Sequence, residues 1–170
     1  MGDKVCDHKS IGIVVKKDGR VLIIERKKFP AGFALPAGHL DGDTFEAGAE
    51  RELREETGIE ASKFDCLFSI ELPNPCRRTE GTHHQWQVFR AAEWQGELKR
   101  AEDETKSAEW ATPERLQGLA LRTEEFAGKH NILVSDLIRL TPALSTDTEW
   151  QSSPGLEPVW YLFLKRLHEI

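Results

Sequence analysis

Two short runs of aliphatic residues open the hydrophobic pattern of the chain, at residues 11–15 and 21–25. Between them lies Asp18-Gly19, a dipeptide that favours the tight turn of a β-hairpin. Three later runs also have the length and composition of strands, namely residues 63–72, 84–92 and 107–111. The chain is therefore predicted to begin with a hairpin and to build a sheet.

A helical pattern separates the second and third of these runs. Every fourth residue from Phe45 to Leu53 is apolar and would form one stripe of a helix over residues 44–57. Asp43 is followed after three residues by a glutamate, as in a capping box, and Gly58 is well placed to end the helix. The pattern predicts a helix that Asp43 caps and Gly58 terminates.

The remaining segments are less regular. Residues 29–43 are rich in Gly, Pro and Asp and are predicted to form an irregular loop, while Thr112-Pro113 predicts a helix start. Residues 131–140 fit a strand or a helix, and residues 140–155 are predicted to be a long surface connection. Apolar residues at helical spacing over 156–167 predict a C-terminal packing helix, so the fold class is mixed α/β.

Composition narrows the class of protein. The chain has 170 residues, 31% of them charged and 39% apolar, which suits one soluble domain and excludes disorder or a membrane span. The net charge of -6 argues against general nucleic-acid binding. The first residues do not resemble a signal peptide, and an odd number of cysteines suits reduced thiols, so a cytoplasmic location is expected.

Three glutamates crowd one region of the predicted helix: Glu52, Glu55 and Glu56. Like charges three or four residues apart cost an isolated helix roughly 0.2–0.5 kcal/mol per pair. A purely structural helix could avoid this cost by using Gln or Lys. The pattern therefore predicts a positive charge opposite these carboxylates.

These glutamates belong to a longer motif. Gly38, Asp43 and residues 51–59 resemble the Nudix box, whose pattern is G-x5-E-x7-R-E-U-x-E-E-x-G-U with U an aliphatic residue. The match is complete from Arg51 onward, and the preceding LPAGH is similar to the LPGGH that commonly leads into the box. The chain departs from the pattern in having four residues between Gly38 and Asp43 instead of five, and Asp43 in place of Glu.

The resemblance implies an α/β/α sandwich around a mixed β-sheet, with the C-terminal helix as an addition. One domain would span residues 1–170, with a core at about 8–120 and an extension at about 121–170 that could cover the pocket or form a homodimer interface. The implied activity is hydrolysis of the diphosphate bond in a nucleoside diphosphate linked to another group. The partner would be a small nucleotide-type molecule, and no membrane is involved.

The resemblance also implies roles for single residues. Glu52 and Glu56 would be the main ligands of Mg²⁺ or Mn²⁺, hard cations that suit carboxylate oxygens. Glu55 would lie nearby, and the backbone carbonyl of Ala37 would complete the shell. Arg51 would orient the carboxylates.

The resemblance also implies a further acid from a loop late in the sheet, as base or metal ligand. Glu104 is the first candidate, with Glu102 and Asp103 as competitors. The residues expected to contact substrate are three arginines that could bind phosphate and one tryptophan that could stack on a base: Arg26, Arg77, Arg78 and Trp86. An acidic run is more often a solvated loop, and most aromatic residues in such a domain are core.

A second metal is also conceivable. Cys6 and His8 near the N-terminus, with Cys76 and the pair His83-His84, supply enough soft ligands for a tetrahedral Zn²⁺ site if the two segments meet. Reduced thiols and solvated histidines are the simpler interpretation.

Two other functions remain open. A nucleotide-binding module without turnover would use the same fold, although the intact set of box glutamates favours catalysis. An isopentenyl-diphosphate isomerase would need a catalytic Cys and Glu in one pocket, and neither Cys66 nor Cys76 lies in a context typical of that enzyme.

Overall fold

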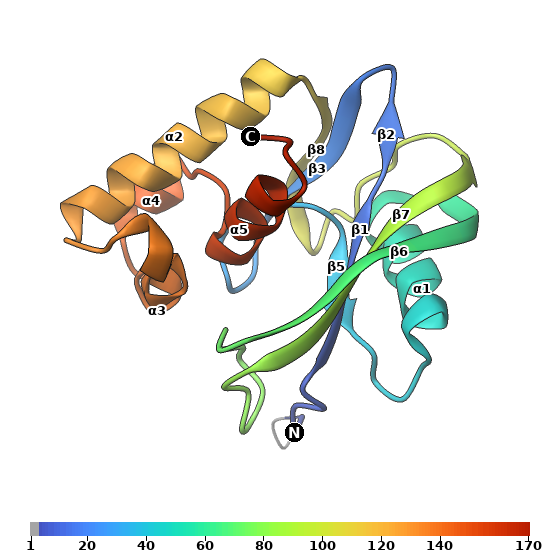
Figure 1. Ribbon diagram of the computed structural model, residues 1–170, viewed down its shortest axis with the longest axis horizontal. Helices are drawn as coiled ribbons and strands as arrows, with labels where there is room; N and C mark the ends of the chain where they lie inside the picture. The colour runs from blue at the N-terminus through green and yellow to red at the C-terminus, as the bar shows by residue number, and fades with distance from the viewer. Residues whose placement is uncertain (1–3) are drawn as a thin grey trace.

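The computed structural model describes residues 4–170 and places helices on both sides of the strands (Figure 1). One four-stranded sheet has the order β5-β1-β7-β6. Its strands are β1 (Lys9–Val14), β5 (Ala37–His39), β6 (Glu60–Leu72) and β7 (His84–Gln95). Because β1 and β7 are parallel while the other two pairs are antiparallel, the sheet is mixed, as predicted.

A second four-stranded sheet contains the hairpin turn, although residues 11–14, which were expected to form its first strand, belong to β1 of the other sheet. It has the order β2-β3-β4, with β8 paired to the other edge of β3, and comprises β2 (Lys16–Lys17), β3 (Arg20–Arg26), β4 (Gly32–Ala34) and β8 (Thr105–Ala111). Lys17 pairs with Arg20, so Asp18 and Gly19 are the two turn residues, and both have positive φ angles. The Asp-Gly prediction is confirmed.

Helix α1 (Phe45–Thr57) ends as the sequence predicts but begins differently. Gly58 has a left-handed conformation and its N–H donates to the carbonyl of Arg54. The N-cap is Thr44, whose hydroxyl accepts a hydrogen bond from the N–H of Ala47 at 3.2 Å, so the prediction of Asp43 as the cap is wrong. Asp43 is instead paired with a side chain of the helix, described below.

Helix α1 covers one side of the strands with its apolar stripe. Ala49 and Leu53 are fully buried and pack in a core with Ile11 and Ile13 of β1 and Phe89 of β7. Burial of this apolar stripe stabilises the helix despite its many charged residues, since most helical stability in proteins comes from packing one face.

A larger core lies on the opposite side, under the C-terminal third of the chain (Figure 1). The helices there are α2 (Pro113–Lys129), the 3-10 helix η1 (Val134–Leu140), α3 (Thr141–Leu144), α4 (Thr148–Ser152) and α5 (Pro158–Arg166). The ambiguous residues 131–140 are thus largely helical, and α5 is the expected packing helix.

The predicted surface connection at residues 140–155 is wrong. Leu140, Leu144 and Trp150 are all fully buried, and the Trp150 indole donates a hydrogen bond to the carbonyl of Ala31 at 2.9 Å. Leu140 ends η1, while Leu144 and Trp150 lie in α3 and α4, which have only four and five residues. Helices this short give no periodic signal, so the polar residues between the three anchors dominate the pattern. In the part of the chain that the structure describes, no helix has the length and apolar character to cross a membrane.

Candidate active site

Two glutamates of α1 face the short strand β5. The carboxylate of Glu56 accepts a hydrogen bond from the backbone N–H of Ala37 at 3.0 Å. The carboxylate of Glu52 lies against Gly38, where an added Cβ would be only 2.2 Å from the Glu52 carboxyl carbon. Glycine at position 38 is therefore what allows strand and carboxylate to approach so closely.

Glu56 is a buried acid with too little positive charge around it. The residue is 4% exposed, and burial raises the pKa of its carboxyl to about 8, with Glu52 adding repulsion. Arg26 and the Ala37 N–H oppose the shift. Burial also raises the pKa of Glu52, against the effect of Arg51. A pair of such carboxyls fits a site for a hard divalent cation, which supplies the missing charge.

Arg51 ties this pair to the loop before the helix. Its guanidinium donates to Glu52 at 2.6 Å and to Asp43 at 2.8 Å, and also to the backbone carbonyl of His39 at 3.0 Å. Asp43 is thus held by an ion pair with Arg51 in the shortened loop. Of the two buried carboxylates, Arg51 contacts that of Glu52, whereas the Ala37 N–H holds that of Glu56.

The other two predicted acids lie further out. The side chain of Glu55 is 56% exposed, with Arg51 at 3.6 Å. Glu104 is 44% exposed and forms an ion pair with Lys28 at 3.1 Å, yet its charge contributes to the raised pKa values of Glu52 and Glu56. The competing acids of the same loop, Glu102 and Asp103, are exposed.

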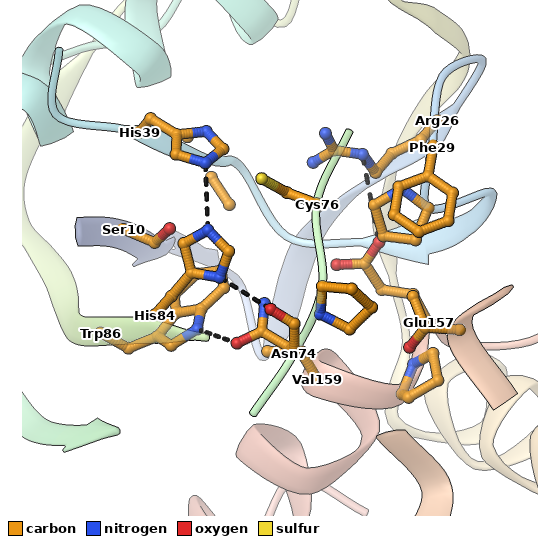
Figure 2. Close-up of a pocket in the computed structure, with 16 residues that line it drawn as sticks. Ser10, Arg26, Phe29, His39, Asn74, Cys76, His84, Trp86, Glu157 and Val159 are labelled. Carbon is orange, nitrogen blue, oxygen red and sulfur yellow. Dashed lines mark hydrogen bonds and ion pairs between the residues drawn. The ribbon is translucent and has the colours of Figure 1, made fainter. Parts of the chain in front are cut away.

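The three residues of β5 also line a pocket, together with residues of β3, β7 and α5 (Figure 2). Trp86 lines it with a ring that is only 6% exposed, and its indole N–H donates to Asn74 at 3.0 Å. Trp86 also packs on Phe163, at 5.3 Å between ring centroids, so it is a core residue with one edge on the pocket. Trp160 and Phe163 are core residues, as expected.

Arg26 and Glu157 meet at the wall of this pocket (Figure 2). Their nearest atoms, Arg26 Nε and Glu157 Oε2, are 4.0 Å apart, and neither atom has a hydrogen-bond partner. Glu157 is 3% exposed, and burial raises the pKa of its carboxyl to about 7, with Arg26 opposing the shift. Sequence reasoning missed Glu157, which stands before Pro158 at the start of α5 and there looks like an ordinary helix-start residue.

The two arginines of the loop between β6 and β7 have different surroundings. Arg78 forms a two-bond ion pair with Asp41, so its charge is already compensated. Arg77 is exposed, and its guanidinium lies 5.8 Å from the ring centroid of Phe29, a pocket residue. Of the two, Arg77 is the one available at the rim of the pocket.

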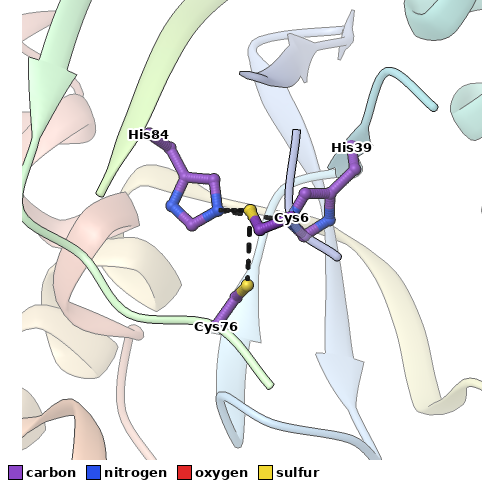
Figure 3. Close-up of side chains that lie close together, drawn as sticks. All are labelled: Cys6, His39, Cys76 and His84. Atoms are coloured by element: carbon purple, nitrogen blue, oxygen red, sulfur yellow. Dashed lines mark hydrogen bonds between the residues drawn. The ribbon is translucent and has the colours of Figure 1, made fainter. Parts of the chain in front are cut away.

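The predicted cysteines and one of the predicted histidines do come together. Cys6, Cys76 and His84 form a cluster whose fourth member is His39, with all four candidate ligand atoms within 4.8 Å of one another (Figure 3). His8 and His83 are not members of this cluster; their rings stack on each other with centroids 4.2 Å apart. The segments meet as the hypothesis required, although His39 replaces the expected His8 or His83.

Comparisons with known proteins agree with this geometry. A model of the NUDIX domain matches residues 7–133. The ADP-ribose pyrophosphatase of Methanocaldococcus jannaschii is 35% identical over 123 residues, which cover 69% of this chain and 70% of the relative. The NAD-capped RNA hydrolase NudC of Pseudomonas aeruginosa is 29% identical over 112 residues, 65% of this chain but 38% of NudC.

A solved structure has the same fold. The MutT NUDIX hydrolase from Burkholderia pseudomallei superposes with a TM-score of 0.55 at 26% identity, covering 64% of this chain and 84% of that protein. The domain match includes β5, α1 and the paired carboxylates between them. The chain belongs to the Nudix hydrolase family.

Proposed function

We propose that the chain is a Mg²⁺- or Mn²⁺-dependent pyrophosphohydrolase that cleaves a nucleoside diphosphate linked to another group, with ADP-ribose-type compounds as the substrate class. The observation that carries the proposal is the pair of inward carboxylates on α1, Glu52 and Glu56, beside a pocket. The relative named ADP-ribose pyrophosphatase supports the substrate class, since it matches most of the chain at 35% identity.

The residues present suit a divalent cation. Glu52 and Glu56 would hold it, with Glu55 and Glu104 beside them and the backbone carbonyl of Ala37 available as a further oxygen ligand. All of these are hard oxygen donors, and the raised pKa of the buried Glu56 marks a carboxyl that lacks a positive partner. When bound, the cation would neutralise phosphate charge and favour displacement at phosphorus by water.

The protein's own groups would orient this reaction. Arg51 holds the Glu52 carboxylate, and the Ala37 N–H holds that of Glu56, so both are fixed before substrate arrives. Arg26 is positioned to offer positive charge to a substrate phosphate. Glu104, near enough to influence both carboxyls, is the residue we assign to accept the proton of the attacking water.

The pocket would take the base or the attached group. Its wall combines two aromatic side chains, Phe29 and Trp86, with the polar atoms of Glu157. Mostly apolar walls with a few placed polar groups are typical of small-molecule sites. Arg77 at the rim would assist the binding of phosphate.

The test is a hydrolysis assay on a substrate panel. ADP-ribose, NAD, nucleotide sugars and nucleoside triphosphates are each incubated with Mg²⁺, with Mn²⁺ and with chelator, and the products are separated by chromatography. The variant is Glu56→Gln, and its matched control is Glu50→Gln, which changes an exposed glutamate on the same helix.

We expect metal-dependent conversion of ADP-ribose to AMP and ribose 5-phosphate. Glu56→Gln should lower kcat by about 10²-fold or more, since it removes the charge of a carboxylate that would hold the cation, while Glu50→Gln keeps wild-type activity. Absence of turnover across the panel, with substrate still raising the Tm, would overturn the proposal in favour of a binding module.

A further inference from the structure

A cluster of soft ligands lies apart from the carboxylate pair, at the opposite end of β5. Cys6 comes from the segment before β1, His39 ends β5, Cys76 lies in the loop between β6 and β7, and His84 begins β7 (Figure 3). All four ligand atoms lie within 4.8 Å of one another. Three segments distant in sequence, at residues 6, 39 and 76–84, thus converge on one point.

The distances between the ligand atoms suit one small ion. The Sγ atoms of Cys6 and Cys76 are 3.7 Å apart, Cys6 Sγ is 3.2 Å from His84 Nε2, and His84 Nε2 is 3.1 Å from His39 Nε2. In tetrahedral Zn²⁺ sites, with Zn–S about 2.3 Å and Zn–N about 2.0 Å, neighbouring ligand atoms are about 3.3–3.8 Å apart. The cluster already has nearly those dimensions.

The orientation of His84 is fixed from outside the cluster. Its Nδ1 lies 2.9 Å from the backbone carbonyl of Asn74, and since a carbonyl only accepts, Nδ1 carries the proton and Nε2 presents its lone pair to the cluster. This is the outer hydrogen bond that metal-binding histidines make. The Asn74 side chain is in turn held by the indole N–H of Trp86 at 3.0 Å.

Both cysteine sulfurs accept hydrogen bonds from backbone N–H groups. The backbone N–H of His8 donates to Cys6 Sγ at 3.3 Å, and that of Arg78 donates to Cys76. Each donor is two residues after its cysteine. Burial and the neighbouring Cys6 raise the pKa of the Cys76 thiol, and the Arg78 N–H opposes this shift. Gly81 allows the loop to fold this tightly, because a Cβ there would lie 2.2 Å from Cys76 Sγ.

Backbone pairing holds the segments together. The N–H of Cys6 donates to the carbonyl of Thr79 at 2.9 Å, and Ser10 of β1 pairs with His39 of β5. Asp41 binds both Lys4 and Arg78, which joins the N-terminal segment, the end of β5 and the loop. The position of each ligand is therefore determined by the fold, as a metal site requires.

We propose that Cys6, His39, Cys76 and His84 bind one Zn²⁺ in a closed structural site. A Cys2His2 set with four protein ligands leaves no open position for chemistry. The zinc site would also contact both the box helix and the pocket. Arg51 of the helix donates to the carbonyl of His39 at 3.0 Å, while Cys76 and His84 line the pocket. The ion would fix the end of β5 between the box helix and the pocket wall.

A disulfide between Cys6 and Cys76 is the main alternative. The sulfurs are 3.7 Å apart, much more than the S–S bond length of about 2.05 Å, and a disulfide leaves unexplained why two imidazoles aim at the same point. The experiment must therefore distinguish bound metal from oxidised thiols.

The full chain is purified without chelators, and its metal content is measured by mass spectrometry of the elements. We expect about one zinc per chain. Cys76→Ser and His39→Ala should each lower the zinc content by about tenfold. The matched controls are Cys66→Ser, at an exposed cysteine of β6, and His83→Ala, at the exposed neighbour of His84; both should keep their zinc.

Cobalt spectroscopy of the wild-type chain gives a readout that does not depend on how a variant folds. Protein stripped of metal and reloaded with Co²⁺ should show thiolate-to-cobalt charge transfer and the intense visible bands of a tetrahedral site. Absence of zinc together with absence of these bands would overturn the proposal. Zinc retained by Cys76→Ser, or an intact mass that shows a Cys6–Cys76 disulfide in the protein as purified, would also overturn it.

Discussion

Replacing Gly38 with alanine should lower the catalytic rate without lowering the stability of the fold. The new Cβ would lie 2.2 Å from the Glu52 carboxyl carbon and 2.3 Å from Glu52 Oε1, where unstrained contacts of a carbon atom are about 3.5 Å or longer. The carboxylate must therefore move by about 1 Å. Because it ends a flexible side chain, it can move without displacing the backbone of β5 or α1.

The consequence falls on the catalytic rate. Displacements of about 1 Å at a catalytic group cost about 10²-fold in rate, or about 2.7 kcal/mol of transition-state stabilisation. The movement also strains the 2.6 Å hydrogen bond from Arg51 to Glu52. We expect Gly38→Ala to lower kcat by about 10²-fold while its Tm stays close to that of the wild type.

The assay is steady-state hydrolysis of ADP-ribose with Mg²⁺ titrated at saturating substrate, alongside thermal unfolding. The control is Gly118→Ala, which adds the same methyl group on the exposed side of α2 with nothing within 4 Å. It should keep wild-type kcat and gain up to about 1 kcal/mol of stability. A Gly38→Ala enzyme with wild-type kcat would refute the role given to the close approach of Gly38 and Glu52.

Three further variants test the surroundings of the site. The raised pKa of Glu157, about 7 against 4.5, gives stability that is complete below pH about 4.5 and is lost as the pH rises through about 7. Without added divalent metal, the wild type should lose about 3 kcal/mol more than Glu157→Gln between pH 5 and 8, and parallel denaturation profiles would contradict this. Gly12→Ala, whose Cβ would lie 2.6 Å from Trp160, should cost about 1–3 kcal/mol in urea unfolding. Trp150→Ala should cost about 3–5 kcal/mol, whereas a loss below 1 kcal/mol would indicate a true surface connection.

Local sequence signals were sufficient to predict helix α1. Residues 51–59 and the apolar stripe of α1 are continuous in sequence, so the pattern alone predicts the helix and the neighbourhood of its glutamates. It does not predict which acid is covered. Glu56 is 4% exposed because β5 lies over it, while the side chain of Glu55 is 56% exposed. That difference depends on a contact between elements, which periodicity within one element does not contain.

The cluster of two cysteines and two histidines shows the same limit over a longer range. Cys6, Cys76 and His84 could be proposed from residue type, but His39 could not, because β5 has only three residues and reads as loop. His39 joins the cluster through the register that pairs it with Ser10 of β1. Antiparallel pairing between distant residues leaves no periodic trace in so short a strand.

Part of the pocket wall lies outside the region that matches the family model. The domain match ends at residue 133, whereas Glu157 and its neighbours in the wall lie beyond it. The match to the family therefore covers the carboxylate pair and Arg51, to which we assign the chemistry, but not the acid that faces Arg26. Because a buried carboxyl near its pKa can donate or accept a hydrogen bond, this wall can discriminate between polar groups of a ligand. We expect Glu157→Gln to change the ratio of KM values between different substrates more than it changes kcat. If the variant changed the KM of every substrate by the same factor, the wall would be only structural.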